Sequence, residues 1–182
     1  MELDGIDLTT ETVRTQRLLL RPYRADDAEA VHRACQDPEI LRWLTVPSPY
    51  TLADAVVFTA ETMPSARAEK RALGCAVEVD GDFIGSAGLS FTEGLLGPGV
   101  GYWIAPWARG RGYATEAARA LADWGLGRGA HRIHLFADVD NAASLGAARR
   151  AGFTAEGTVR GCLDYRDGSR ADAVLFGRVA GD

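Results

Sequence analysis

Apolar and polar residues alternate in some segments of the chain, while in others the apolar residues recur every three or four positions. The first pattern is typical of strands and the second of helices. The predicted strands cover 17–22, 74–79, 82–90, 99–105, 132–138, 153–161 and 171–179, and the predicted helices cover 26–35, 51–70, 113–126 and 142–151. The order β-α-α-β-β-β-α-β-α-β-β predicts an α/β (α+β) fold, in which helices cover both faces of a mixed, mostly antiparallel sheet.

Two dipeptides predict turns between neighbouring strands. Asp80-Gly81 separates two β-rich segments, and Asp-Gly is a preferred sequence for a type I′ turn. These two segments are therefore expected to form a hairpin. Asp167-Gly168 is expected to lie in the turn that joins the last two strands.

Prolines and capping residues set several other boundaries. Pro38 is expected to close the first helix, and two prolines within 43–50 exclude regular structure there. Thr51, followed by Asp54 three residues later, resembles a capping box and starts the second helix. Pro64 is expected to break that helix.

The composition indicates an ordinary folded domain. The chain has 182 residues, of which 47% are hydrophobic and 25% are charged. No internal repeat or Pro/Gly/Ser-rich linker divides it, so we expect a single domain over 1–182. No apolar run approaches the roughly 20 residues needed to cross a bilayer. The start, Met1-Glu2-Leu3-Asp4, has neither the basic nor the apolar region of a signal peptide.

Charge, cysteines and histidines exclude several classes of function. A net charge of −5 argues against a protein that binds DNA. Cys35, Cys75 and Cys162 are far apart and odd in number, which favours a reducing cytoplasm over a disulfide framework. His131 and His134, three apart on a predicted strand, point to opposite faces and do not share a metal. We therefore expect a cytoplasmic protein with no metal site and no membrane contact.

The segment 103–116 (WIAPWARGRGYATE) places a loop rich in glycine and arginine between a strand and a helix. The first N–H groups of a helix have no partner within it and lie at the positive end of its dipole, which favours an anion. Gly110 and Gly112 allow the backbone to approach a phosphate closely. Arg109 and Arg111 add cationic donors. The sequence therefore predicts a phosphate site at this loop.

Two common phosphate-binding motifs do not fit this loop. It lacks the Lys-Ser/Thr pair that ends the loop of proteins that bind and hydrolyse nucleoside triphosphates. It also lacks G-x-G-x-x-G and follows a late strand instead of opening a β-α-β unit, so it does not predict a dinucleotide fold. A loop that contacts RNA is a weaker alternative, which the negative net charge disfavours.

The loop resembles one in a known family. Arg109-x-x-Gly112-x-Ala114 matches the Q/R-x-x-G-x-G/A pattern of the GNAT N-acetyltransferases. Further matches follow the family's order over about 15–178 and are similar to its ribosomal-protein (RimJ/RimL-like) subgroup: RLLLRP at 17–22, GYWI at 101–104, GYATE at 112–116, Asn141-x-x-Ser144, Gly152-Phe153, Arg166-Asp-Gly168 and Asp172. The resemblance implies an N-acetyltransferase that uses acetyl-CoA as co-substrate and no metal.

The resemblance also implies roles for individual residues toward acetyl-CoA. Backbone groups around Ile104 would bind the pantetheine arm, and Arg150 would lie near the 3′-phosphate. Asn141 would hydrogen-bond the cofactor, although it is also a candidate N-cap for the helix that follows. The pyrophosphate would be held by the backbone amides of the loop, which are those of Arg109, Gly110, Arg111, Gly112, Tyr113, Ala114 and Thr115.

For the chemistry, the resemblance implies direct attack of an amine on the thioester, with Ser144 reprotonating the CoA thiolate. Without the resemblance, the position of Ser144 in the first turn of a predicted helix indicates a capping or solvent-exposed residue. The glutamate that often serves the subgroup as a base is absent, because its position holds Gly99, and Glu93 is the candidate in its place. An α-amine, with a pKa of about 7.7–8.0, needs less help from a base than a lysine does. We therefore favour an α-amine or a small-molecule amine.

The acceptor side is the least defined. Trp43 and Tyr50 lie in the proline-containing segment that borders the acceptor site in the family, and their alternative role is core packing. The acceptor, a protein N-terminus or a small amine, is left open. So is the choice between an enzyme and a non-catalytic acyl-CoA-binding module, which Gly99 keeps in consideration. The oligomeric state is also open, with pairing along the last strands as the form that a homodimer would take.

Overall fold

One sheet runs through the molecule. The computed structural model describes residues 1–91 and 94–182, and within them eight strands form a sheet in the order β1-β2-β3-β4-β5-β6-β8-β7. The strands are β1 (Val13–Arg14), β2 (Leu19–Arg21), β3 (Ala72–Val79), β4 (Asp82–Ser90), β5 (Gly99–Ile104), β6 (Arg132–Asp138), β7 (Thr154–Asp164) and β8 (Arg170–Val179). Neighbouring strands are antiparallel except β5 and β6, which confirms the predicted mixed sheet.

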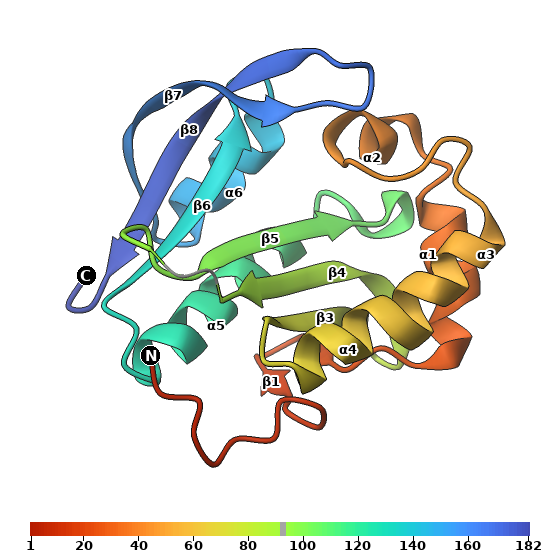
Figure 1. Cartoon of the computed structure of the whole chain (residues 1–182), viewed down its shortest axis with the longest axis horizontal. Coiled ribbons are helices and arrows are strands. Elements are labelled where there is room, and N and C mark those ends of the chain that lie inside the picture. Colours follow the sequence, from red (N-terminus) through yellow and green to blue (C-terminus); the bar gives the residue numbers. More distant parts are fainter. Residues whose placement is uncertain (92–93) are drawn as a thin grey trace.

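Helices cover both faces of this sheet, as predicted. They are η1 (Ala25–Asp27), α1 (Ala28–Ala34), α2 (Pro38–Trp43), α3 (Leu52–Val57), the π-helical turn η2 (Phe58–Thr62), α4 (Met63–Ala68), η3 (Pro106–Ala108), α5 (Tyr113–Gly127) and α6 (Ala142–Arg150). Helices α3 and α4 lie in front of the sheet in Figure 1, and α5 and α6 lie behind it. No helix of the described residues is long and apolar enough to cross a membrane.

Each face of the sheet has its own hydrophobic core. Leu89 of β4, Leu121 of α5 and Ile133 of β6 are fully buried in the larger cluster, on the α5 face. Val31 of α1 and Phe83 of β4 belong to the second cluster, on the opposite face. Because successive side chains of a strand point to opposite faces, the central strands contribute to both cores.

The strands β5 and β6 pair at a single position and then diverge. Gly99 pairs with His134, and the His134 N–H donates to the Pro98 carbonyl at 2.9 Å. Figure 1 shows the two strands separating toward their carboxyl ends. Beyond Gly99, the edge of β5 that faces β6 therefore has no paired strand within the described part of the chain.

The predicted hairpin is confirmed. Asp80 and Gly81 adopt positive φ angles of 51° and 92°, as a type I′ turn requires, and Val79 pairs directly with Asp82. The capping box that starts the second predicted helix is also present, because the Thr51 side chain accepts from the Asp54 N–H.

The first helix ends at Ala34, as the predicted end near Cys35 requires, but Pro38 has another role than the one expected, and the break predicted at Pro64 is wrong. Pro38 opens α2 instead of closing a helix: Asp37 accepts from the Ile40 N–H at 3.0 Å, and the first helical position needs no N–H from proline. Pro64 does not break the second helix, since helical turns run without interruption from α3 through η2 into α4. The π-helical turn η2 directly precedes Pro64, and such turns accommodate an interruption of the regular hydrogen-bond ladder.

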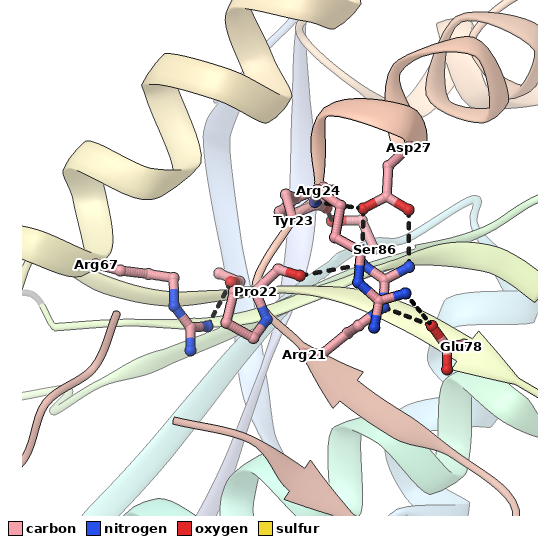
Figure 2. Close-up of polar contacts among 9 residues, drawn as sticks. Arg21, Pro22, Tyr23, Arg24, Asp27, Arg67, Glu78 and Ser86 are labelled. Carbon is pink, nitrogen blue, oxygen red and sulfur yellow. Dashed lines mark hydrogen bonds and ion pairs between the residues drawn. The ribbon is translucent and has the colours of Figure 1, made fainter. Parts of the chain in front are cut away.

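A buried ion cluster joins β2, η1 and β3 (Figure 2). Arg21 donates to the two carboxylate oxygens of Asp27 at 2.7 and 2.8 Å and to Glu78 at 2.5 Å. The side chains of Arg21, Asp27 and Glu78 are only 5%, 4% and 11% exposed. Arg24 makes a longer contact with Glu78 at 3.3 Å and is 56% exposed. The cluster fixes the chain entering α1 against the sheet.

Candidate active site

The unpaired edge of β5 presents backbone hydrogen-bonding groups. The Ala105 N–H donates to the Ile84 carbonyl of β4 at 2.9 Å. Because the backbone groups of a strand alternate in direction, those of Tyr102 and Ile104 point away from β4 and toward β6. The Ile104 carbonyl accepts from Arg109 Nε at 3.2 Å, in agreement with that direction. An extended ligand that contains amides could pair with this edge.

The loop after β5 leaves the start of α5 uncapped. Gly110 and Gly112 adopt φ angles of 77° and 79°, and a Cβ at Gly110 would meet nothing within 4 Å. Gly112 is the N-cap of α5, and no side chain of the described residues bonds its first N–H groups. By contrast, a side chain caps each of α2, α3 and α6. The first turn of α5 therefore offers N–H groups to an anion.

An arginine from the segment before β2 braces this loop. Arg17 Nη1 donates to the Arg111 carbonyl at 3.0 Å, and Arg17 Nε donates to Glu116 at 2.7 Å. The guanidinium carbon lies 4.8 Å from the centre of the Tyr113 ring. Burial raises the pKa of Glu116, but hydrogen bonds from Thr15 and Arg17 outweigh this effect and hold the pKa below its usual value. The carboxylate in the first turn of α5 is thus ionised and paired with Arg17.

The guanidinium of Arg109 is engaged with the protein. Its Nη2 donates to Asp37 at 2.6 Å, in addition to the bond from Nε to Ile104. The hydrogen bond from Arg109 lowers the pKa of Asp37. Arg109 thereby links α2 to the end of β5, while Arg111 has an exposed side chain.

Two hydroxyl groups meet between β5 and α6. The Tyr102 hydroxyl lies 3.2 Å from Ser144 Oγ and 3.3 Å from the Ser144 carbonyl. Burial raises the pKa of Tyr102, so the phenol keeps its proton. The Asn141 side chain accepts from the Ser144 N–H at 3.0 Å, so Asn141 is the N-cap of α6. Sequence reasoning assigned no role to Tyr102, because an aromatic residue on a strand is most often a packing residue.

Three other residues expected at the cofactor lie on α5 and α6. Arg150 folds back along α6, and its Nη1 lies 3.0 Å from where a Cβ of Gly146 would be. Its positive charge acts on Tyr102 and slightly offsets the effect of burial on the pKa of that phenol. Ala114 and Thr115 lie half-buried in the first turn of α5. Thr115 Oγ1 is buried and has no hydrogen-bond partner among the residues described.

A cavity of about 270 Å³ lies on the α1 face of the sheet, beside Trp103. Its walls are mostly apolar and come from α1, η2, β5 and the segment after α2: Val31, Cys35, Leu44, Thr45, Val46, Pro47, Tyr50, Phe58, Thr62 and Trp103. Tyr50 is one of these walls. Trp43 points elsewhere, with Nε1 donating to Glu39 at 3.3 Å on α2 itself. Burial raises the pKa of Cys35 to about 11, so its thiol is protonated.

The tip of the β7–β8 hairpin reaches the segment that forms this cavity. Arg166 Nη1 donates to the Val46 and Pro47 carbonyls at 3.1 and 3.4 Å. Thr45 Oγ1 donates to the Asp164 carbonyl at 3.4 Å. Figure 1 shows this hairpin tip beside α2, so parts of the chain remote in sequence close one end of the cavity.

Two further expectations concern the base and the metal. Glu93, the candidate base, lies outside the described residues. Within 1–91 and 94–182, no group of three or more His, Cys, Asp or Glu side chains could hold a metal ion.

Comparisons with known proteins identify the family to which the fold and sequence are similar. The family model of the Acetyltransferase (GNAT) domain matches residues 17–154. The uncharacterised N-acetyltransferase p20 of Bacillus licheniformis is 25% identical over 174 residues, which cover 91% of this chain and 94% of that protein.

Two solved structures share the fold. RimJ of Mycobacterium smegmatis, in complex with CoA-disulfide, has a TM-score of 0.79 and 25% identity, over 93% of this chain and 88% of that one. The microcin C7 self-immunity acetyltransferase MccE, in complex with acetyl-CoA and AMP, has a TM-score of 0.80 and 21% identity, over 98% and 97%. Because the family model covers most of the sequence, from the strand before α1 to the start of β7, the chain belongs to the GNAT family of acetyltransferases.

Proposed function

We propose that the protein transfers the acetyl group of acetyl-CoA to a primary amine, either the α-amine of a protein N-terminus or a small-molecule amine. The observation that carries this proposal is the uncapped start of α5, directly after a glycine loop and beside the unpaired edge of β5. A pyrophosphate needs N–H donors and positive potential, and a pantetheine arm carries amides. The loop and the edge offer a partner to each. The similarity to RimJ, solved with a CoA compound, supports the same assignment.

The proposed cofactor position follows from these groups. The pyrophosphate lies against the N–H groups of 109–115, and the pantetheine arm runs along Tyr102 and Ile104. Asn141 uses its side-chain oxygen as a cap, which leaves its NH₂ group as a donor to the cofactor. Arg150 supplies positive charge on the α6 side, where the 3′-phosphate would lie.

The hydroxyl pair of Tyr102 and Ser144 supplies the proton that the leaving group needs. As the amine attacks the thioester carbonyl, the C–N bond forms and the amine loses a proton to solvent. The C–S bond then breaks, and the sulfur takes a proton from Ser144, which lies within hydrogen-bond reach of the Tyr102 phenol and regains a proton from solvent. The mostly apolar cavity beside Trp103 lies on the opposite face of β5 and is the proposed approach of the acceptor.

Calorimetric titration of acetyl-CoA and CoA into the full chain tests this proposal. We expect one site with a roughly micromolar dissociation constant. A screen of peptides with free α-amines and of small amines, read by thiol release, then identifies the acceptor. Absence of binding refutes the proposal at its root. Binding without transfer to any amine supports the non-catalytic module instead.

Replacing Ser144 by alanine is expected to lower kcat about 100-fold, because the thiolate loses its proton donor. The acetyl-CoA dissociation constant is expected to stay within about twofold, since the cap that Asn141 provides uses the backbone N–H of residue 144. Steady-state thiol release and calorimetry measure the two effects. A variant with unchanged kcat would remove Ser144 from the mechanism.

Replacing Arg17 by leucine is expected to weaken acetyl-CoA binding about tenfold, roughly 1.4 kcal/mol. The change frees the Arg111 carbonyl and leaves the Glu116 carboxylate without its cationic partner near the proposed phosphate position, with Thr15 as its remaining side-chain donor. Arg128→Leu is the matched control, because Arg128 pairs with Glu11 and lies over the Trp124 ring at the other end of α5. Equal effects of both variants on calorimetric affinity would show that the brace has no specific role.

A further inference from the structure

The face of β5 and β6 opposite α5 forms an open surface beside the cavity. Ile133 and Leu135 of β6 are buried on the α5 face, so His134 and Phe136 point to the other side, where their rings lie 5.4 Å apart. On β5 the corresponding positions are Gly99, Gly101 and Trp103. Gly101 is exposed, and a Cβ there would meet nothing within 4 Å. A small acceptor could therefore lie over Gly101, between Trp103 and His134.

The imidazole of His134 fills the space that a side chain at position 99 would take. A Cβ at Gly99 would lie 2.8 Å from His134 Cε1 and 2.9 Å from Nε2. These two residues form the single pair of β5 with β6, so the ring stands where the two strands begin to diverge. The glycine makes room for the histidine, and the Cε1–Nε2 edge of the partly exposed ring lies over Gly99, on the same face of β5 as Gly101.

The hydrogen bond of the other ring nitrogen sets the tautomer. His134 Nδ1 lies 3.0 Å from the Gly97 carbonyl, which can only accept. Nδ1 therefore carries the proton in the neutral ring, and Nε2 carries the lone pair. Among the described residues, no hydrogen-bond donor or acceptor is bonded to Nε2.

We propose that His134 is the general base of the acetyl transfer. This inference rests on the proposed function. Nε2 takes one proton from the bound ammonium, directly or through one water, and the resulting neutral amine attacks the thioester carbonyl. As the C–N bond forms and the C–S bond breaks, the nitrogen loses its second proton to solvent, and the sulfur takes a proton from the Tyr102–Ser144 pair, which solvent then reprotonates. The imidazolium releases its proton to solvent, so that ammonium and acetyl-CoA give amide, free CoA and one proton, with base and acid on opposite faces of β5.

The two charged side chains near His134, Arg132 and Glu156, have opposite charges and pair with each other. Arg132 and Glu156 reach the space beside Gly177, the β8 partner of His134, and Arg132 Nη1 donates to Glu156 at 2.7 Å. The hydrogen bond from Arg132 lowers the pKa of Glu156, so this carboxylate is ionised at and above neutral pH. From β4 the facing side chain is the uncharged Ser90, and β5 faces the ring with Gly99.

The tautomer is tested on the full chain without any acceptor. Long-range proton–nitrogen NMR correlations report which nitrogen of each of the three histidines is protonated, and the signals lost in His134→Asn identify His134. We expect the proton on Nδ1 at alkaline pH. A proton on Nε2 overturns the proposal, because that nitrogen could not then accept another.

The rate test uses His134→Asn, in which the side-chain amide nitrogen can replace Nδ1 as donor to Gly97. With the amine found in the thiol-release screen, kcat is expected to fall about 100-fold at pH 7. The loss is expected to shrink below about tenfold as the pH nears the pKa of the amine, which then needs no base. His131→Asn, an exposed histidine just before β6, is the matched control and is expected to match the wild type.

The possible outcomes distinguish a failure of the His134 assignment from a failure of the proposed acetyl transfer. Unchanged acetyl-CoA affinity with the pH-dependent loss supports His134 as the base. A loss equal at all pH values, or no loss, overturns this assignment while transfer by the wild type stands. A wild type that binds no acetyl-CoA, or acetylates no amine, overturns the proposed function and the base with it.

Discussion

Replacing Arg21 by methionine is expected to lower the free energy of unfolding by about 3–5 kcal/mol. The change keeps much of the side-chain volume but leaves Asp27 and Glu78 without the guanidinium that now bonds both of them. Since these carboxylates are almost inaccessible to water, solvent cannot replace the lost partner. Urea unfolding followed by circular dichroism measures the difference.

Arg24→Met is the control for this prediction. Arg24 contacts the same Glu78 but is largely exposed, so its loss is expected to change stability by less than about 1 kcal/mol. Similar destabilisation by the two variants would show that burial does not set the strength of this cluster. If the free energy of unfolding of Arg21→Met equals that of the wild type, the two carboxylates must form other interactions in the variant.

Replacing Gly112 by aspartate is expected to weaken acetyl-CoA binding about 100-fold or more, roughly 2.7 kcal/mol. The new carboxylate would stand at the N-terminus of α5, where it would accept from the N–H groups that the pyrophosphate needs and would repel its charge. Calorimetric titration of the variant measures the loss.

Gly129→Asp separates this effect from backbone strain. Gly129 follows α5, has a φ of 82° and has open space at its Cβ position, so aspartate is strained there by a similar amount, roughly 1–2 kcal/mol. We expect wild-type acetyl-CoA affinity for this variant. Equal losses at both glycines would assign the effect to stability and not to the phosphate site.

Local sequence predicts those parts of the fold that neighbouring residues determine. The Asp80-Gly81 turn is confirmed because its two residues alone set the required backbone angles. The helix boundaries predicted from Pro38 and Pro64 differ from the structure, because a proline indicates only that one backbone N–H is missing. Whether a helix starts there, or continues through a π turn, depends on Asp37 and on the packing of α3 and α4. The divergence of β5 and β6 depends on the whole sheet and has no local signal.

In the candidate site, too, the features set by neighbouring residues could be predicted, and those set by distant residues could not. The loop at 109–115 was visible in the sequence, because glycines before a helix have a direct physical meaning. Tyr102 and His134 had no such signal, because their proposed roles depend on partners 42 and 37 residues away, Ser144 and the Gly97 carbonyl. On a strand, an aromatic or a histidine has no spacing that separates a packing role from a chemical one.

The hydrogen bonds that hold the loop at 109–115 have a thermodynamic consequence. Arg109 holds the loop at its start, through Asp37 and Ile104, and Arg17 holds it near its end, through Arg111. A ligand that binds here meets a backbone whose conformational freedom is already reduced, so little further ordering opposes association. Binding at this loop should therefore carry a small entropic penalty from the protein, and most of that ordering takes place when the chain folds.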